Sequence, residues 1–183
     1  MKTLTLFLTL ATLFVAGRSM AQEKTVTVGG APMYPSKNII ENAVNSKDHT
    51  TLVAAVKAAG LVETLSGSGP FTVFAPTNSA FDKLPKGTVE TLVKPENKTM
   101  LTGILTYHVV AGKMSAEDLM KAIKDGSGKA SLTTVAGGKL TATQKGKKIM
   151  LTDAKGNVAT VTTADVFQSN GVIHVIDTVL MPE

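Results

Sequence analysis

The sequence predicts an α+β fold, in which helices come first and a meander of strands follows. Helical patterns dominate between residues 37 and 125, whereas Thr- and Val-rich segments separated by Gly- and Asn-containing turns fill the chain after residue 130. Hydrophobic residues make up 43% of the 183 residues and charged residues 18%, which is enough apolar surface for a buried core. Because helices and strands are segregated, we expect an α+β domain and not an alternating βαβ fold.

The first 21 residues carry the pattern of a secretory signal peptide. Lys2 forms a short positive region, an apolar stretch runs from Leu4 to Ala16, and Ser19-Met20-Ala21 offers small residues for signal peptidase. A membrane anchor is a weaker interpretation, because a spanning helix needs roughly 20 apolar residues. We expect a secreted mature chain beginning near Gln22, located in the periplasm, at the cell surface or outside the cell, with no stable membrane insertion.

Charge and cysteine content exclude several classes of protein. The formal net charge is +5, and loss of residues 1–21 removes Lys2 and Arg18 and no acidic residue, which leaves +3. The chain has no cysteine, so disulfides, thiolate metal sites and a lipidated cysteine are excluded. With two tyrosines and no tryptophan it lacks stacking platforms for single strands, so no nucleic-acid partner is expected.

Residues 22–36 are expected to form a flexible lead-in, because two glycines and two prolines interrupt any regular pattern there. The folded domain is then expected over residues 37–183. The length of the chain suits one ordinary domain plus a short extra segment.

Helical patterns fill most of residues 39–125. Asp48 is expected to cap a helix that runs to Gly60 and buries Leu52, Val53, Val56 and Ala59. Further helices are expected at 39–44 and near 78–84, the second capped by Thr77, Asn78 or Ser79, with Ser79 and Asp82 as a capping box. Another is expected after Pro95, with Met100 and Leu101 in the core. A last one is expected after Ser115, which pairs with Asp118 in a capping box. Residues 66–70 form a loop, and strands are expected at 71–74 and 107–110.

The last third of the chain is predicted to be a β meander. Turn sequences such as Lys155-Gly156-Asn157 and Ser169-Asn170-Gly171 separate its apolar segments. Strands are expected near 132–135, 140–143, 149–151, 158–162, 165–167 and 172–176. The last of these is apolar on both faces except for His174, which indicates a central strand.

Three segments together resemble the fasciclin (FAS1) family. They run from Gly69 to Phe81, from Leu105 to Val110 and from Ser169 to Asp177, and they resemble the first conserved block, the Tyr-His block and the second conserved block of that family. The resemblance covers nearly all of the mature chain, and all three blocks at this spacing are specific. It implies the FAS1 fold, a β-wedge of about six to seven strands with several helices packed around it.

The resemblance also implies a function. Members of the family are secreted or cell-surface proteins, and many mediate adhesion between cells or to the matrix. The partners implied are therefore a cell-surface or matrix protein or a polysaccharide. This sequence carries one copy of the domain, and one copy bridges two surfaces only if it self-associates or has two binding faces.

Carried over from the family, the Tyr-His pair is Tyr107 and His108, and this pair is the candidate interaction site by resemblance alone. The residues themselves favour another role for His108. It lies beside an apolar segment, where buried polar groups are usually hydrogen-bonded, so we expect a structural hydrogen bond in the core. Either burial or a surface contact suits Tyr107.

No pattern in the sequence indicates an enzyme, a metal site or a cofactor. The histidines are His49, expected to be solvated, His108, and His174, expected in the core, and no HExxH motif joins them. Ser68 lies between glycines, but the sequence there is not a GxSxG nucleophile elbow. We therefore expect no catalytic residues, no bound metal and no cofactor.

Three functions remain in order of preference. The first is a secreted, non-enzymatic adhesion or extracellular-matrix module. The second is a binder of a small apolar or lipid-like ligand, which requires a pocket of about 300 Å³ or more. An uncharacterised hydrolase is a distant third. The lysines of one predicted hairpin, Lys139, Lys145, Lys147 and Lys148, either protect a sheet edge or contact an anionic polysaccharide or lipid.

Overall fold

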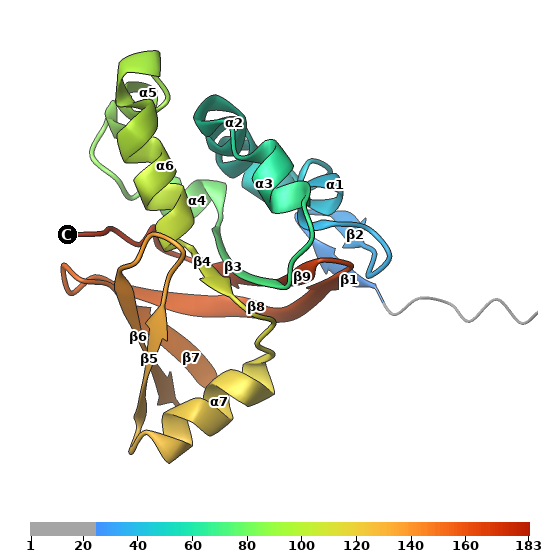
Figure 1. Cartoon of the computed structure of the whole chain (residues 1–183), viewed down its shortest axis with the longest axis vertical. Helices are drawn as coiled ribbons and strands as arrows, with labels where there is room; N and C mark the ends of the chain where they lie inside the picture. Colours follow the sequence, from blue (N-terminus) through green and yellow to red (C-terminus); the bar gives the residue numbers. More distant parts are fainter. Residues whose placement is uncertain (1–24) are drawn as a thin grey trace, which may run out of the picture.

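A curled seven-stranded sheet runs through residues 25–183, the part of the chain that the computed structural model describes (Figure 1). The predicted signal peptide, residues 1–21, lies outside these residues. The strands lie in the order β4-β3-β9-β8-β7-β6-β5, with bounds β3 Phe71–Pro76, β4 Val109–Ala111, β5 Lys129–Thr133, β6 Lys139–Lys145, β7 Lys148–Thr152, β8 Val158–Gln168 and β9 Gly171–Ile176. The expected α+β class and β-wedge are confirmed.

One parallel pair of strands sits inside this otherwise antiparallel sheet. β3 pairs with β9 in parallel, with Phe71 opposite Gly171 and Pro76 opposite Ile176. A single bridge between Val110 and Thr134 links β4 to the segment after β5 and brings the two sheet edges together. The sheet is therefore almost closed, which limits the edge available for aggregation.

β8 is the longest strand, and it joins the two halves of the sheet. The sequence predicted two strands here, at 158–162 and 165–167. The structure has one, with register shifts between Val161 and Thr163 and between Thr163 and Val166. Asp165 has a positive φ of 58° within this irregular stretch. The interruption between the two predicted strands therefore corresponds to bulges that bend a single strand.

Helices cover one side of the sheet and a single helix covers the other (Figure 1). The helices α1–α6 stand together, with bounds α1 Ile39–Ala43, α2 Thr50–Ala59, α3 Val62–Ser66, α4 Asn78–Phe81, α5 Thr88–Leu92 and α6 Lys98–Tyr107, and short 3₁₀ turns at Lys47–His49 and Pro95–Asn97. The last helix, α7 Ala116–Asp125, lies beside β5–β7. Among residues 25–183, no helix has both the length and the hydropathy to span a bilayer.

Local capping residues in the sequence predicted several helix ends correctly. Ser115 caps α7 and forms the predicted capping box with Asp118. Gly60 ends α2 in the left-handed conformation, with φ 73°, as its position predicted. At α4 the cap is Thr77, whose hydroxyl accepts from the Ala80 amide, and not the expected Ser79–Asp82 box.

Part of the expected flexible lead-in is an ordered β-hairpin. β1, Val26–Val28, pairs with β2, Ala31–Met33, across a turn formed by Gly29 and Gly30. Val28 and Met33 are buried in the core, so the glycines mark a tight turn and not a linker.

Two further predictions need correction. Residues 107–110 were expected to form one strand, but Tyr107 ends α6, His108 is its C-cap and β4 begins at Val109. Short apolar runs fit a helix end as well as a strand, which explains the error. Met100, expected in the core, is 61% exposed on α6.

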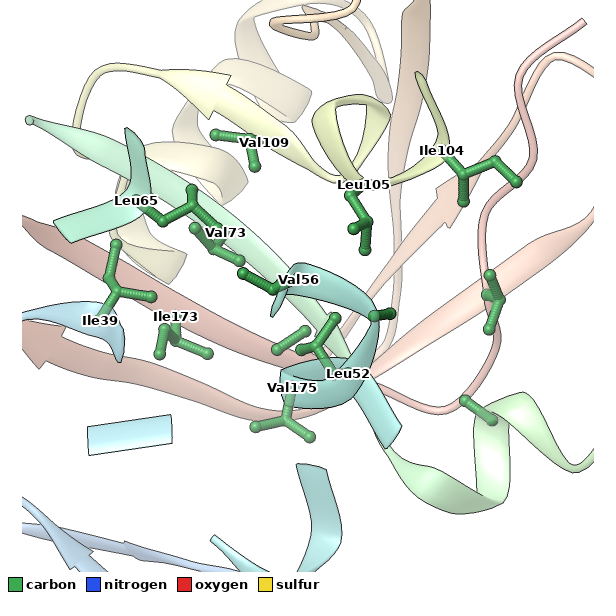
Figure 2. Close-up of a cluster of buried hydrophobic side chains, with 14 of the residues drawn as sticks. Ile39, Leu52, Val56, Leu65, Val73, Ile104, Leu105, Val109, Ile173 and Val175 are labelled. Carbon is green, nitrogen blue, oxygen red and sulfur yellow. The ribbon is translucent and has the colours of Figure 1, made fainter. Parts of the chain in front are cut away.

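The apolar side chains form two separate cores. The helix-side core lies between the sheet and α1–α3 and α6, and Figure 2 shows Val56, Leu65, Val73, Leu105 and Ile173 pointing toward one another there. The α7-side core lies between α7 and the curl of β5–β8 and centres on Leu119, Leu140, Leu151 and Tyr107. These two names are kept below.

Candidate functional site

The first and last of the three resembling segments meet at one end of β3 and β9. The backbone amide of Phe71 donates to the carbonyl of Asn170 over 3.1 Å. The two backbones touch here, because a Cβ on Gly69 would collide with the Asn170 backbone and one on Gly171 with the Phe71 backbone. Both positions therefore require glycine for lack of space.

Asn170 ties this junction to two helices. Its Oδ1 accepts from the Ile39 amide at the start of α1 over 3.0 Å. Its Nδ2 donates to the carbonyls of Leu65 and Gly67, at the end of α3, over 2.8 and 3.0 Å. One side chain thus fixes the loop between α3 and β3 against the β8–β9 turn.

A polar groove of about 590 Å³ lies on this junction. It is lined by the loop Ser66–Pro70, by Asn38 and Lys113, and by Ser169–Gly171. Lys113 is its one charged lining residue, and none of the lining residues is acidic. Within the described chain, the hydroxyls of Ser66, Ser68 and Ser169 make no hydrogen bond, so they are available to a ligand.

An exposed aromatic ring lies close to this groove. Phe167 is 37% exposed, and the Lys113 ammonium lies over its ring, 4.8 Å from the centroid. The buried Thr72 hydroxyl holds the backbone on either side of Lys113, since it donates to the Gly112 carbonyl over 2.7 Å and accepts from the Met114 amide over 2.9 Å. Lys113 therefore projects from a fixed turn. We call the groove together with Phe167 the motif groove.

Tyr107 and His108, the pair carried over from the family, lie at the other end of β4 and are buried. Tyr107 is 1% and His108 3% exposed. The Tyr107 hydroxyl donates to the Lys139 carbonyl over 2.7 Å and accepts from the Ala154 amide over 3.1 Å. In this structure neither side chain offers a surface to a partner.

His108 makes the structural hydrogen bonds that its sequence context predicted. Nδ1 lies 2.8 Å from the Ile104 carbonyl, and Nε2 accepts from the Leu180 amide over 3.0 Å. The bond from Leu180 requires an unprotonated Nε2, so the proton is on Nδ1. Burial lowers the pKa of His108 to about 4, against smaller opposing effects of the Ile104 carbonyl and Asp153. The imidazole is therefore neutral at pH 7.

The other two histidines are also buried, and His49 was expected to be solvated. His174 is fully buried in β9, as predicted, with Nε2 2.9 Å from the Met114 carbonyl. His49 is only 3% exposed, and its Nδ1 lies 2.9 Å from the Ser46 hydroxyl. Ser46 itself is 1% exposed, so no substrate reaches this Ser–His contact, which counts against a hydrolase.

Asp165 and Asp177 hold backbone amides of the fold. Asp165 accepts from the Ala116 amide at the start of α7 over 2.7 Å, and Asp177 accepts from the Thr160 amide over 2.8 Å. Among residues 25–183, no three His, Asp or Glu side chains gather as metal ligands would.

Sequence reasoning missed the roles of Asn170 and Thr72. Asn170 was interpreted as a turn residue and Thr72 as one position of a strand. The Asn-Gly pair signals a turn, but nothing local indicates that its amide reaches partners over 100 residues away.

Comparison with known proteins places these features in a family. The fasciclin domain model matches residues 47–182. Protein sll1483 of Synechocystis is 51% identical over 160 residues, covering 87% of this chain and 82% of that protein. The cell surface glycolipoprotein MPB83 of Mycobacterium bovis is 37% identical over 168 residues, covering 92% of this chain and 64% of that protein.

A solved structure shares the fold. It is the FAS1 domain pair of the insect cell adhesion molecule Fasciclin I, with a TM-score of 0.71 and 18% identity over 87% of this chain and 58% of that one. The family match begins at residue 47, so the hairpin β1–β2 and α1 lie outside it although they complete the helix-side core. By the domain match and the identity to its relatives, the chain belongs to the fasciclin family.

Proposed function

We propose that this protein is a secreted, non-enzymatic adhesion module that binds an acidic polysaccharide of the cell surface or matrix through the motif groove. The observation that carries the proposal is the groove itself, which is lined by serine hydroxyls that make no hydrogen bond within the described chain, by the Lys113 side chain and by no acidic residue. Its volume of about 590 Å³ suits two or three sugar units, since ligand pockets span about 300–1,000 Å³.

The chemistry of the groove fits a uronate-containing chain. Serine hydroxyls exchange hydrogen bonds with sugar hydroxyls, and the Lys113 ammonium pairs with a carboxylate. The exposed part of the Phe167 ring, which lies under the Lys113 ammonium, offers apolar area to the C–H groups of a sugar. The groove is open to solvent, so a segment within a polymer has access to it.

The proposal assigns Tyr107 and His108 a role in folding and not in contact. Their hydrogen bonds lie within the chain, and their partners are backbone groups of β6, of the β7–β8 turn and of the C-terminal segment. A change at either residue then affects attachment only as far as it affects folding.

Secretion forms part of the same proposal. It is supported by the leader pattern in residues 1–21 and by the name of the relative MPB83, a cell surface protein. Intact-mass analysis of protein recovered outside the cytoplasm is expected to show a chain beginning at Gln22. A chain that retains Met1 would contradict secretion by cleavage.

Attachment of protein-coated beads tests the binding role. Beads carrying residues 22–183 are expected to attach to the producing cells and to immobilised polygalacturonate, and less so at high salt. Lys113→Gln is expected to weaken binding about tenfold, because a charged hydrogen bond is lost. Phe167→Ala is expected to weaken it by a similar factor.

Two matched variants control for general charge and surface effects. Lys147→Gln removes an exposed lysine of the β6–β7 turn, and Val158→Ala removes an exposed apolar side chain of β8. Both are expected to bind as the wild type does. Equal losses in Lys113→Gln and Lys147→Gln would mean that binding follows net charge, and the groove assignment would fail.

A further inference from the structure

The lysines of the β6–β7 hairpin do not protect a sheet edge, which was one of the two roles considered for them. β6 is paired with β5 on one side and with β7 on the other, and β7 is paired with β6 and β8. The backbone groups of both strands are therefore already used within the sheet. This leaves the other role, contact with an anionic partner.

Positive charge is concentrated in the part of the chain that contains this hairpin. Residues 121–155 have eight lysines and two acidic residues, a formal charge of +6. The rest of residues 22–183 has nine lysines and twelve acidic residues, a formal charge of −3. The small net charge thus combines a strongly positive region, which attracts anionic partners, with a weakly negative remainder.

Four of these lysines lie on one side of the sheet. Lys145 is opposite Lys148, and Lys129 is opposite Thr143. Residues two apart along a strand point to the same side, so Lys139, Thr143 and Lys145 of β6 share it. Alternate positions of these strands bury apolar side chains in the α7-side core, so the four lysines point outward, and all four are exposed. We call this side of the sheet the lysine face.

Hydroxyl side chains occupy the space between the lysines. By the same registers the lysine face also contains Ser131, Thr133, Thr141, Thr143, Thr152 and Thr160. Within the described chain none of these hydroxyls makes a hydrogen bond, and none of the four ammonium groups makes an ion pair. The strands β5–β7 contain no acidic residue, so the donors of this face are free for an anionic partner.

The lysine face is convex and broad. The sheet curls around the α7-side core, and Figure 1 shows α7 on the inner side of β5–β7 and, among residues 25–183, no helix on the outer side. From Lys139 to Lys145 the face extends about 20 Å along β6, and from β5 to β7 about 10 Å across the strands. The ammonium groups are therefore spread over an area and do not follow a line.

We propose that the lysine face docks on a lipid bilayer whose phosphate headgroups carry a net negative charge. Each lysine close to such a surface strengthens binding about fivefold. The hydroxyls of the face donate hydrogen bonds to phosphate oxygens. Half-buried Met150 and exposed Val158 lie on the same face, opposite Thr160 and Thr152, and add a small apolar contact at the headgroup boundary.

Other partners fit this face less well. A linear polymer contacts a groove or a row of side chains, and not a convex area. A small ligand needs a pocket of about 300 Å³ or more, whereas the apolar cavity in the helix-side core is about 50 Å³. A second copy of the chain that docked through the same face would bring lysines against lysines.

This inference goes beyond the adhesion proposal and does not rest on it. The lysine face and the motif groove share no residue, so either can fail alone. Together they give one domain two binding faces, which a single copy needs if it is to hold a polymer at a membrane.

Sedimentation with lipid vesicles tests the inference on residues 22–183. Binding is expected to vesicles of phosphatidylglycerol and phosphatidylcholine in equal parts, and it is expected to fall steeply with added salt. Vesicles of phosphatidylcholine alone are expected to leave the protein in solution. Equal sedimentation with both kinds of vesicle, or with neither, would overturn the proposal.

Two double variants with the same loss of charge locate the contact. Lys145→Gln with Lys148→Gln is expected to weaken vesicle binding about 25-fold. Lys86→Gln with Lys94→Gln, at exposed lysines on either side of α5, is expected to change it less than about twofold. Thermal melts check that each variant folds, and the comparison of vesicles with the wild type decides the matter if one does not.

Two results with these variants would contradict the assignment. Equal losses in both double variants would mean that vesicle binding follows net charge and not the lysine face. If the variant of the face lost attachment to polygalacturonate but kept its binding to vesicles, the face would belong to the polymer and the lipid assignment would fail.

Discussion

The two cores differ in the surroundings of their buried polar side chains. In the α7-side core the Tyr107 hydroxyl is both a donor and an acceptor, with partners at 2.7 and 3.1 Å. In the helix-side core the buried His49 ring contacts the Ser46 hydroxyl through Nδ1 at 2.9 Å and borders an apolar cavity of about 50 Å³. The Tyr107 hydroxyl is thus satisfied within the α7-side core, whereas the helix-side core contains a cavity and lies beside the motif groove.

This difference suggests that one half of the domain provides stability and the other half binds the polysaccharide. Leu119, Leu140 and Leu151 are fully buried at the centre of the α7-side core, which makes it a source of stability. The helix-side half instead carries residues 66–70, which line the motif groove together with the turn at 169–171. The predictions below test whether stability and binding separate in this way, from the largest expected effect to the smallest.

Leu119→Ala should have the largest effect on stability. Leu119 has no exposed area, so the change leaves a cavity and is expected to cost about 2–5 kcal/mol in the free energy of unfolding. Urea denaturation followed by circular dichroism measures it. Met120→Ala, at a half-buried neighbour, is the control and should cost clearly less. A loss below about 1 kcal/mol at Leu119 would show that this core is not tightly packed.

Acid should destabilise the fold through its buried histidines. His108 has a folded pKa of about 4, below its unfolded value of 6.5, so the unfolded chain binds a proton first as pH falls. Its contribution is fully present above pH 6.5 and is lost between pH 6.5 and 4, by about 3 kcal/mol in all. Burial lowers the pKa of His49 and His174 as well, which adds to the effect in the same direction.

Thermal melts across pH 4 to 8 measure this dependence. His108→Leu is expected to be less stable at pH 7, because the Leu180 amide loses its acceptor, but to show a shallower loss toward pH 4. Parallel curves for the two proteins would mean that His108 does not titrate as described.

Tyr107→Phe should cost about 1–2 kcal/mol, because the Lys139 carbonyl and the Ala154 amide both lose their partner. Tyr34→Phe, at a 38% exposed position, is the control and should change stability little. At temperatures where Tyr107→Phe stays folded, bead attachment should equal that of the wild type. Weaker attachment by a fully folded variant would restore Tyr107 as a contact residue.

Phe167→Ala should have the smallest effect on stability, within about 0.5 kcal/mol, because the ring is partly exposed. Its effect on attachment is expected to be large in comparison. A variant that loses stability and keeps full attachment would reverse the proposed division between the two halves.

How far the sequence predicted the fold depended on the range of the interactions. The meander and the capping box at Ser115 were predictable because turn and cap signals lie within a few residues of one another. The burial of His49 was not, because its partner Ser46 is held against Gly29 of a hairpin that looked like a linker. The same holds for Asn170, whose amide joins segments 103 to 131 residues apart.

The candidate site was predictable only in part. The motifs that contain Gly69 and Gly171 were recognised, and the structure brings them together at the groove. The sequence did not show which residues face outward. Tyr107 and His108 carry the more distinctive side chains, yet they are buried. Lys113 and Phe167, which lie at the groove, look like ordinary surface residues in the sequence.

The central claim, that binding belongs to the motif groove, is tested most directly by a backbone amide shift map of the mature protein during titration with oligogalacturonate. We expect the largest shifts on residues 66–70, on Lys113 and on residues 167–171. Shifts centred on the lysines at 145–148, with the groove unchanged, would contradict it and place the polysaccharide on the β6–β7 hairpin.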